Sequence, residues 1–90
     1  MYMKDFFKIF VYMHGEEIGK LFVTRGFDLS LSRKVGKGEQ THIIYRRNGC
    51  AELAEYNVLD GVIGRVFLFR GDEVTCAYAL DEIEKWLGVI

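Results

Sequence analysis

The chain has 90 residues, half of them hydrophobic and 14% aromatic, which suffices for one packed core and is too short for two. This composition excludes intrinsic disorder, and the absence of proline from the sequence excludes proline-rich linkers and polyproline docking segments. The net charge of −1 hides an uneven distribution. Residues 25–47 carry six basic and two acidic side chains, whereas residues 48–90 carry three basic and eight acidic ones. We therefore expect a single domain over residues 1–90, with a basic middle and an acidic C-terminal half.

Glycine-containing turn signals recur along the chain, at His14-Gly15, Arg25-Gly26, Gly36–Gly38, Asn48-Gly49, Asp60-Gly61 and Gly71-Asp72. Asn-Gly and Asp-Gly favour two-residue hairpins, because a type I′ turn needs positive φ at both central residues. Turns that recur every ~8–12 residues are typical of consecutive antiparallel strands. The predicted strands are rich in β-branched and aromatic residues and lie at 6–13, 18–24, 29–35, 41–47, 65–70 and 73–79.

Segment 50–59 fits two structures. As a strand it pairs back on residues 41–47 through the Asn-Gly turn, which places His42 near Glu55. As a helix it is capped by Asn48 and ends near Gly61, and its alanine, glutamate and leucine content favours this second structure.

The C-terminal segment is a clearer helix. Its apolar residues Leu80, Ile83, Leu87 and Ile90 share one helical stripe, its first turn is acidic, and Gly88 is a natural stop. A helix this short is marginal alone, so we expect it to dock on the sheet. The predicted fold is α+β: an antiparallel β-meander of five to seven strands, with this amphipathic helix packed on it and a second helix at 50–59 as the open alternative.

Catalytic and cofactor motifs are absent from the sequence. His14, His42, Cys50 and Cys76 lack the paired spacing of metal ligands, and no serine or cysteine lies in a nucleophile motif. Two cysteines make no disulfide framework and read as reduced thiols. We therefore predict no catalytic, cofactor-binding or metal site, and a protein that is not an enzyme.

The N-terminal apolar run does not have the form of a signal peptide, because Asp5 and Lys8 interrupt it and no small-residue cleavage site follows. No apolar run approaches the ~18 residues that a membrane-spanning helix needs. These features predict a cytoplasmic protein with no membrane partner.

The basic stretch 25–47 is the best candidate for a binding surface. Its charge would lie as a ribbon along a hairpin of residues 29–35 and 41–47, in which Tyr45 and His42 are interleaved. An acidic protein surface, a nucleic acid or plain solvent would each suit such a ribbon, and the net charge of −1 disfavours nucleic acid. The predicted partner-binding residues, which include two N-terminal aromatics, are Arg33, Lys34, Lys37, Tyr45, Arg46, Arg47, Phe10 and Tyr12.

Most predicted strands are apolar on both sides. Residues 65–70 place Val66 and Leu68 on one side and Phe67 and Phe69 on the other, and the segments 6–13, 18–24 and 41–47 have a similar pattern. A sheet with one solvated face would alternate more cleanly. Since short helices can cover only one face, we expect the other to bind a second copy or another protein. The alternative is a strongly curled sheet that buries both sets of side chains, as a small barrel with a helical plug.

The function predicted from these features is that of a small, non-catalytic protein-binding module that acts by occupying a surface on another macromolecule. An inhibitor or adaptor, such as mobile genetic elements often encode, is of this kind. The alternatives are nucleic-acid binding through the basic hairpin 25–47, and a small enzyme with a site near His42 at a dimer interface.

Overall fold

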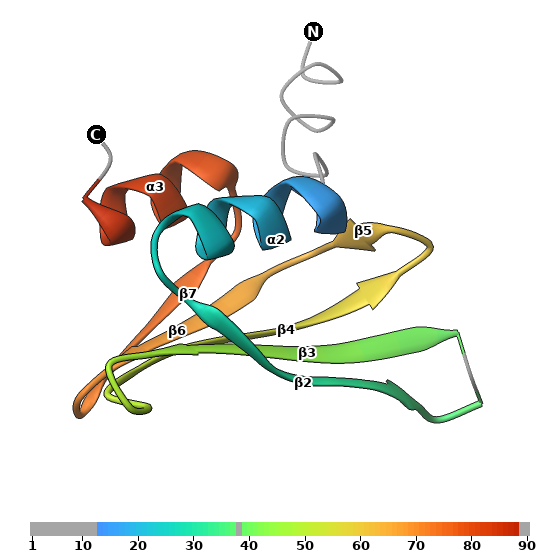
Figure 1. Ribbon diagram of the computed structural model, residues 1–90. Helices are drawn as coiled ribbons and strands as arrows, with labels where there is room; N and C mark the ends of the chain where they lie inside the picture. The colour runs from blue at the N-terminus through green and yellow to red at the C-terminus, as the bar shows by residue number, and fades with distance from the viewer. Residues whose placement is uncertain (1–12, 38, 89–90) are drawn as a thin grey trace, which may run out of the picture.

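The computed structural model describes residues 13–37 and 39–88, which form one seven-stranded antiparallel sheet and two helices (Figure 1). In chain order the elements are β1 (Met13–His14), α2 (Gly15–Thr24), β2 (Asp28–Val35), β3 (Gln40–Arg47), β4 (Glu52–Leu59), β5 (Val62–Ile63), β6 (Val66–Arg70), β7 (Glu73–Ala77) and α3 (Leu80–Leu87). The predicted α+β class is confirmed, with its antiparallel sheet and its C-terminal helix. Of the predicted strand 6–13, only Met13 lies within the described residues.

The sheet is an open one in the described part of the chain. Strands β2, β3 and β4 pair in sequence order, and the far side of β4 pairs with β6 through residues 52–55 and with β5 through Leu59. On their other sides, β5 pairs with β1 and β6 pairs with β7. Since β2 and β7 each have one neighbouring strand, these residues do not close into the barrel that was the alternative prediction.

Residues 18–24, predicted as a strand, lie instead in helix α2, so that prediction was wrong. Ile18 and Phe22 are four positions apart and fully buried, which puts both on the helix face that contacts the sheet. Two glutamates in the first turn favour the helix electrostatically. The β-branched residues Val23 and Thr24, which suggested a strand, are exposed and do not decide the structure.

Segment 50–59 forms strand β4, so the favoured helix was wrong and the strand alternative was right. Asn48, Gly49 and Cys50 all have positive φ, and Arg47 lies opposite Glu52, so residues 48–51 form the connection and it is two residues longer than the predicted Asn-Gly hairpin. Residues 52, 54 and 56 are buried while their neighbours are more exposed, a period of two that outweighs helix propensity. The expected proximity of His42 and Glu55 is confirmed at 2.7 Å, but as a diagonal contact, because the longer turn shifts the register by two residues and places His42 opposite Asn57.

Edge strand β2 carries an irregularity close to its start. Its register with β3 shifts between Leu29 and Leu31, so Ser30 is an extra residue in the ladder. The remaining positions alternate, and Arg33 lies opposite His42 in β3 while Lys34 lies opposite Thr41.

Both helices pack on the same face of the sheet (Figure 1). The core between them contains a group of aromatic rings: Phe22 lies 5.2 Å from Phe27 and 5.6 Å from Tyr45, and Phe27 lies 6.1 Å from Trp86 of α3. Helix α3 begins where the Glu82 carboxylate accepts hydrogen bonds from two backbone N–H groups, and it ends at Gly88 in the left-handed conformation. No helix in the described ranges is long and apolar enough to cross a membrane.

We expect Gly19→Ala to destabilise the protein by about 1 kcal/mol, although alanine normally favours a helix over glycine by about as much. A Cβ atom at this position would lie 2.9 Å from the Tyr45 hydroxyl oxygen. The Tyr45 ring is stacked on Phe22 and on Tyr56, so it cannot turn aside without loss of packing. Urea unfolding measures the effect. Adding Tyr45→Phe should make Gly19→Ala stabilising, and a stabilising effect without it would show that the ring yields easily.

Candidate functional site

The strands direct their side chains alternately to two faces. Ile43, Tyr45 and Tyr56 point toward the helices, whereas Ile44 and Glu55, which lie opposite each other in the β3–β4 ladder, point to the other side. We call this second side the open face, because both helices lie on the opposite face of the sheet (Figure 1).

An apolar strip crosses the open face from β2 to β7. Leu31 lies opposite Ile44, Phe67 opposite Cys76, and Phe69 opposite both Leu53 and Val74. Between β3 and β4 the members are diagonal neighbours, because Ile44 lies opposite Glu55 and Leu53 opposite Arg46. Six are half-buried, and Val74 is 61% exposed. The strip consists of Leu31, Ile44, Leu53, Phe67, Phe69, Val74 and Cys76.

Charged side chains border the strip. Arg33 and Arg46 come from β2 and β3, and the guanidinium of Arg65 lies 5.0 Å from the centre of the Phe67 ring. Within the described ranges none of these three arginines forms an ion pair. Glu55 lies inside the strip, and its Oε2 is 2.7 Å from His42 Nε2. Two further carboxylates are Asp28, which lies opposite Arg46, and Asp60, in the β4–β5 turn.

A hollow of about 780 Å³ opens on the same face beside the strip. It is bounded by β3, β4, β5 and β6, and its lining includes His42, Glu55, Asn57, Arg65, Phe67 and Phe69. This volume is in the range of small-molecule and side-chain pockets. The hollow mixes apolar walls with a few polar groups, as binding sites commonly do.

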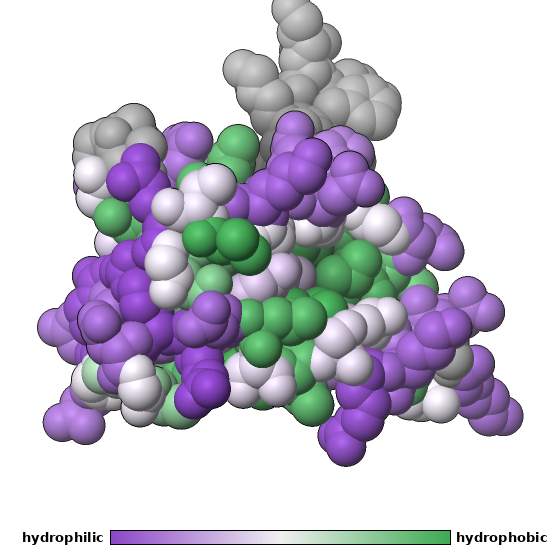
Figure 2. All heavy atoms as spheres, viewed as in Figure 1, coloured by the Kyte–Doolittle hydropathy of each residue, from purple (hydrophilic) through white to green (hydrophobic). Residues whose placement is uncertain are grey.

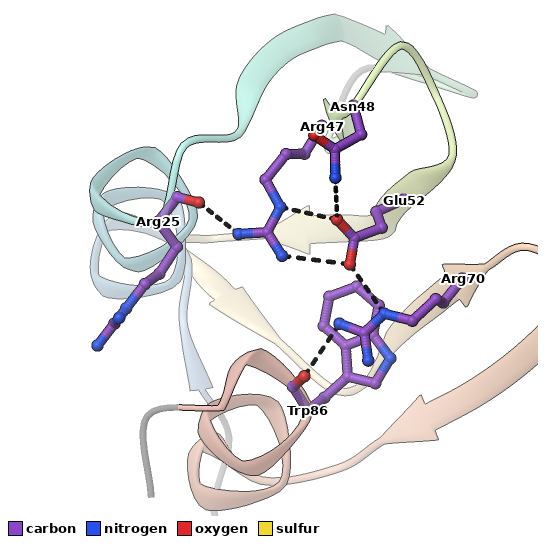
Figure 3. A network of polar contacts seen from close by, with 6 residues as sticks. All are labelled: Arg25, Arg47, Asn48, Glu52, Arg70 and Trp86. Atoms are coloured by element: carbon purple, nitrogen blue, oxygen red, sulfur yellow. Dashed lines mark hydrogen bonds and ion pairs between the residues drawn. The ribbon is translucent and has the colours of Figure 1, made fainter.

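The opposite face contains a polar network around Glu52, which is buried (Figure 3). Arg47 binds this carboxylate through Nε at 2.8 Å and Nη2 at 3.2 Å, and Arg70 binds it through Nε at 2.8 Å. Asn48 Nδ2 donates a fourth hydrogen bond, at 2.9 Å. The hydrogen bonds from Arg47, together with those from Arg70 and both positive charges, outweigh burial and lower the pKa of Glu52 from 4.5 to about 2.

The same two arginines attach the helices to the sheet. Arg47 donates to the backbone oxygen of Arg25, just after α2, and lies over the Phe27 ring at 4.5 Å. Arg70 donates to the backbone oxygen of Trp86 in α3 and lies over its ring at 4.1 Å. This network is therefore structural (Figure 3).

Tyr45 and Tyr56 are stacked on each other in the core on this side of the sheet. Burial raises the pKa of Tyr56 above its ordinary value of 10.0, and the neighbouring Tyr45 adds to the shift. The Tyr56 hydroxyl is therefore neutral across the physiological pH range and supplies no general base.

The predicted partner-binding residues do not lie together. Arg33 and Arg46 lie on the open face, Lys34 faces the other way, and Lys37 is in the β2–β3 turn. Tyr45 and Arg47 point to the helices, where they pack in the core and bind Glu52. Phe10 and Tyr12 lie outside the described residues. The structure thus joins two of the eight to the open face.

Sequence reasoning named none of the strip residues or Arg65 as partner-binding. The signal was present in residues 65–70, whose apolar side chains alternate between faces, and it indicated an uncovered face without saying which strands would form its centre.

A second apolar area lies on the helix side. Figure 2 shows hydrophobic side chains between α2 and the β2–β3 strands, with hydrophilic ones on either side. A hollow of about 630 Å³ adjoins the start of α2, and Ile43, Tyr45 and Val58 line it. These three side chains pack against the buried core, so this area is a margin of the core rather than a separate face.

Residues 13–37 and 39–88 contain no group of three or more histidine, cysteine, aspartate or glutamate side chains arranged to hold a metal ion. Cys50 and Cys76 are both free cysteines; Cys50 is exposed and Cys76 is half-buried.

No protein-family model matches the chain, and neither a curated protein nor a solved structure matches it significantly. The geometry of the open face is therefore what indicates a function.

Proposed function

We propose that the protein is a non-catalytic binding module whose open face docks on another protein. The observation that supports this proposal is the apolar strip, which runs from β2 to β7 on the face away from both helices of the described residues. Contiguous apolar surface on a small globular protein usually marks an interface. Occupying a surface on the partner, as an inhibitor or an adaptor does, needs no catalytic group.

The proposed partner surface has an apolar centre and acidic residues around it. Arg33, Arg46 and Arg65 border the strip and make no ion pair in the described part of the chain, whereas Glu55 already contacts His42. Charges at the border of an interface speed association and orient the partners more than they add affinity. Two carboxylates without an ion-pair partner in the described residues also lie on this side: Asp28 is opposite Arg46, and Asp60 is in the β4–β5 turn.

A different protein suits this face better than a second copy of the chain. Two copies packed face to face would bring the three arginines of each copy into one interface, with few unpaired carboxylates to offset them. The cytoplasm is the proposed location, because two free thiols are typical of a reducing compartment.

Single-stranded nucleic acid is the second candidate. Phe67 and Phe69 project from neighbouring positions of β6, and Arg65 lies over Phe67, an arrangement on which bases can stack. Aliphatic side chains nevertheless make up most of the strip, and they offer no π face to a base. This favours the protein partner.

Val74→Glu should weaken partner binding at least tenfold, because it places a carboxylate in the apolar strip. Val74 is on edge strand β7 and 61% exposed, so the variant should fold as wild type does. The matched control is Val23→Glu on α2, where the valine is 56% exposed and away from the open face. The measurement compares proteins that wild-type and variant chains retain from a lysate of the producing cells, with thermal melts to verify folding.

The expected result is one retained protein that wild type and Val23→Glu capture and Val74→Glu does not. Equal retention by all three chains would contradict docking through the open face. Sedimentation of the purified chain tests whether a second copy binds. Salt-dependent binding of a single-stranded oligonucleotide that Val74→Glu weakens, without a retained protein, would support the nucleic-acid candidate instead.

A further inference from the structure

The hollow on the open face arises from a bulge in the strand opposite β4. Glu55 pairs with Phe67 and Leu59 pairs with Val62, so four steps along β4 face five steps along the other strand. The side chains show the same extra residue: Ile63 and Val66 are both fully buried toward the helices although they are three positions apart. Gly64 and Arg65 are the residues between them, which places the bulge there.

The bulge has two effects on the open face. Gly64 contributes no side chain, which leaves room above Asn57 and its neighbours in β4. The Arg65 side chain extends along its own strand toward Phe67, and its guanidinium carbon lies over that ring, 5.0 Å from the centroid. Bulges often occur beside binding sites because they redirect one side chain in this way.

The charged side chains around the hollow differ in whether they already have a partner. Glu55 is in contact with His42 at 2.7 Å, and Asp60 lies at the hairpin turn that bounds the hollow. Arg65 has no ion-pair partner in the described residues, and a guanidinium that stacks on a ring keeps its N–H edges for a carboxylate. An incoming carboxylate can therefore pair with Arg65 while an apolar group enters the space beside Phe67 and Phe69.

We infer that this hollow is the anchor pocket of the interface, and that it takes an aromatic side chain of the partner that has a carboxylate next to it. The inference rests on the proposed function, because the hollow is part of the open face. Buried aromatic side chains dominate the energy of many interfaces, and a volume of about 780 Å³ is ample for one ring. The second face of the Arg65 guanidinium offers that ring a further surface for stacking.

Three small probes that differ mainly in charge test the inference without the partner: phenylacetate, phenylacetamide and the benzylammonium ion. Titration followed by ¹H–¹⁵N NMR reports both the site and the dissociation constant. We expect phenylacetate to shift the amides of residues 55–57 and 64–69, and to bind about fivefold tighter than phenylacetamide. Tightest binding of benzylammonium would overturn the inference, since Glu55 and Asp60 would then dominate the hollow. Shifts outside these residues, or none, would also overturn it.

Variants of Arg65 separate charge from simple access to the hollow. Arg65→Gln should bring phenylacetate to the affinity of phenylacetamide, whereas Arg65→Lys should keep most of the difference. Arg25→Gln removes one arginine from the helix side and is the matched control for net charge; the Arg25 side chain points away from the network around Glu52 (Figure 3). Loss of the charge preference in Arg25→Gln would refute a specific role of Arg65.

The two proposals can fail separately. Partner retention that Val74→Glu abolishes, together with probes that do not bind the hollow, would refute the anchor pocket and leave the open face as the interface. If the probes bind as expected but Val74→Glu retains the partner as well as wild type does, the proposed function is refuted and the hollow remains a small-ligand site.

Discussion

Glu52→Gln is expected to lower the free energy of unfolding by about 3 kcal/mol and the melting temperature by roughly 15 °C. The substitution keeps the size of the side chain and removes the charge that Arg47 and Arg70 share. Breaking a buried ion pair from one side costs ~3–5 kcal/mol. The low end applies, because the arginine side chains are 25% and 43% exposed and water can solvate them in part. For a domain with a total stability of ~5–10 kcal/mol, this is a large loss.

The control is Glu55→Gln, the same change three residues along strand β4 on the open face. Glu55 is 37% exposed and contacts one histidine, so its loss should cost less than about 1 kcal/mol. Chemical denaturation of the three proteins measures both effects. Equal losses for the two variants would mean that the network around Glu52 does not hold the fold.

Acidification should remove the difference between wild type and Glu52→Gln. The pKa of Glu52 is about 2 in the folded protein, against an ordinary value of 4.5, so the unfolded chain takes up the proton first. The stabilisation is fully present above pH ~4.5 and is lost as the pH falls through this window toward 2. Denaturation curves at several pH values should therefore converge, and a difference that stays constant down to pH 2 would assign the loss to packing.

Phe22→Ala is expected to cost about 4 kcal/mol. The Phe22 side chain is completely buried, and its ring lies within 5.2–6.4 Å of the rings of Phe27, Tyr45 and Tyr56. Truncation removes the contact of α2 with this aromatic group and leaves a cavity between the helix and the sheet. Urea unfolding of the variant measures the loss.

Val23→Ala is the neighbouring control, and it should change stability by less than about 0.5 kcal/mol, because Val23 is 56% exposed. Similar effects at both positions would be expected if residues 18–24 were a strand at the surface. The contrast between 22 and 23 thus tests whether this segment is a helix with one buried face.

The α+β class and most strand positions follow from the sequence. Asp60-Gly61 forms the two-residue hairpin that its residues predict, because Leu59 lies opposite Val62 and both turn residues have positive φ. The Asn48-Gly49 turn joins the predicted strands, but it extends to residue 51 and shifts their register. The facing of β6 also follows: Val66 and Leu68 are fully buried, while Phe67 and Phe69 are half-exposed. In these segments local preference and burial agree.

The errors occur where preference and tertiary contact disagree. Segment 18–24 contains β-branched residues, but burial of Ile18 and Phe22 at a spacing of four decides for a helix. Segment 50–59 has good helix formers, but pairing with β3 on one side and β6 on the other decides for a strand. Strand β5 has two residues and carries too little pattern to be seen.

The candidate site was predictable in kind and not in detail. A double-sided apolar pattern indicated an uncovered face, yet charge alone could not separate Arg46, which lies on that face, from Arg47, which is bound to Glu52. Adjacent residues of a strand point to opposite sides, so every second member of a basic run belongs to another environment. The bulge that redirects Arg65 depends on the register with β4, which only the folded sheet defines.

The shifted register at the start of β2 also bears on aggregation through the edge of the sheet. A sheet with an apolar face and an unpaired edge can add strands from other chains and grow into aggregates. An extra residue at Ser30 interrupts the ladder on that edge, and Arg33 and Lys34 follow it with charge. A neighbouring chain cannot extend the sheet there without breaking register or burying a cation. The irregular, charged edge therefore opposes the edge-to-edge pairing that an apolar open face would otherwise favour.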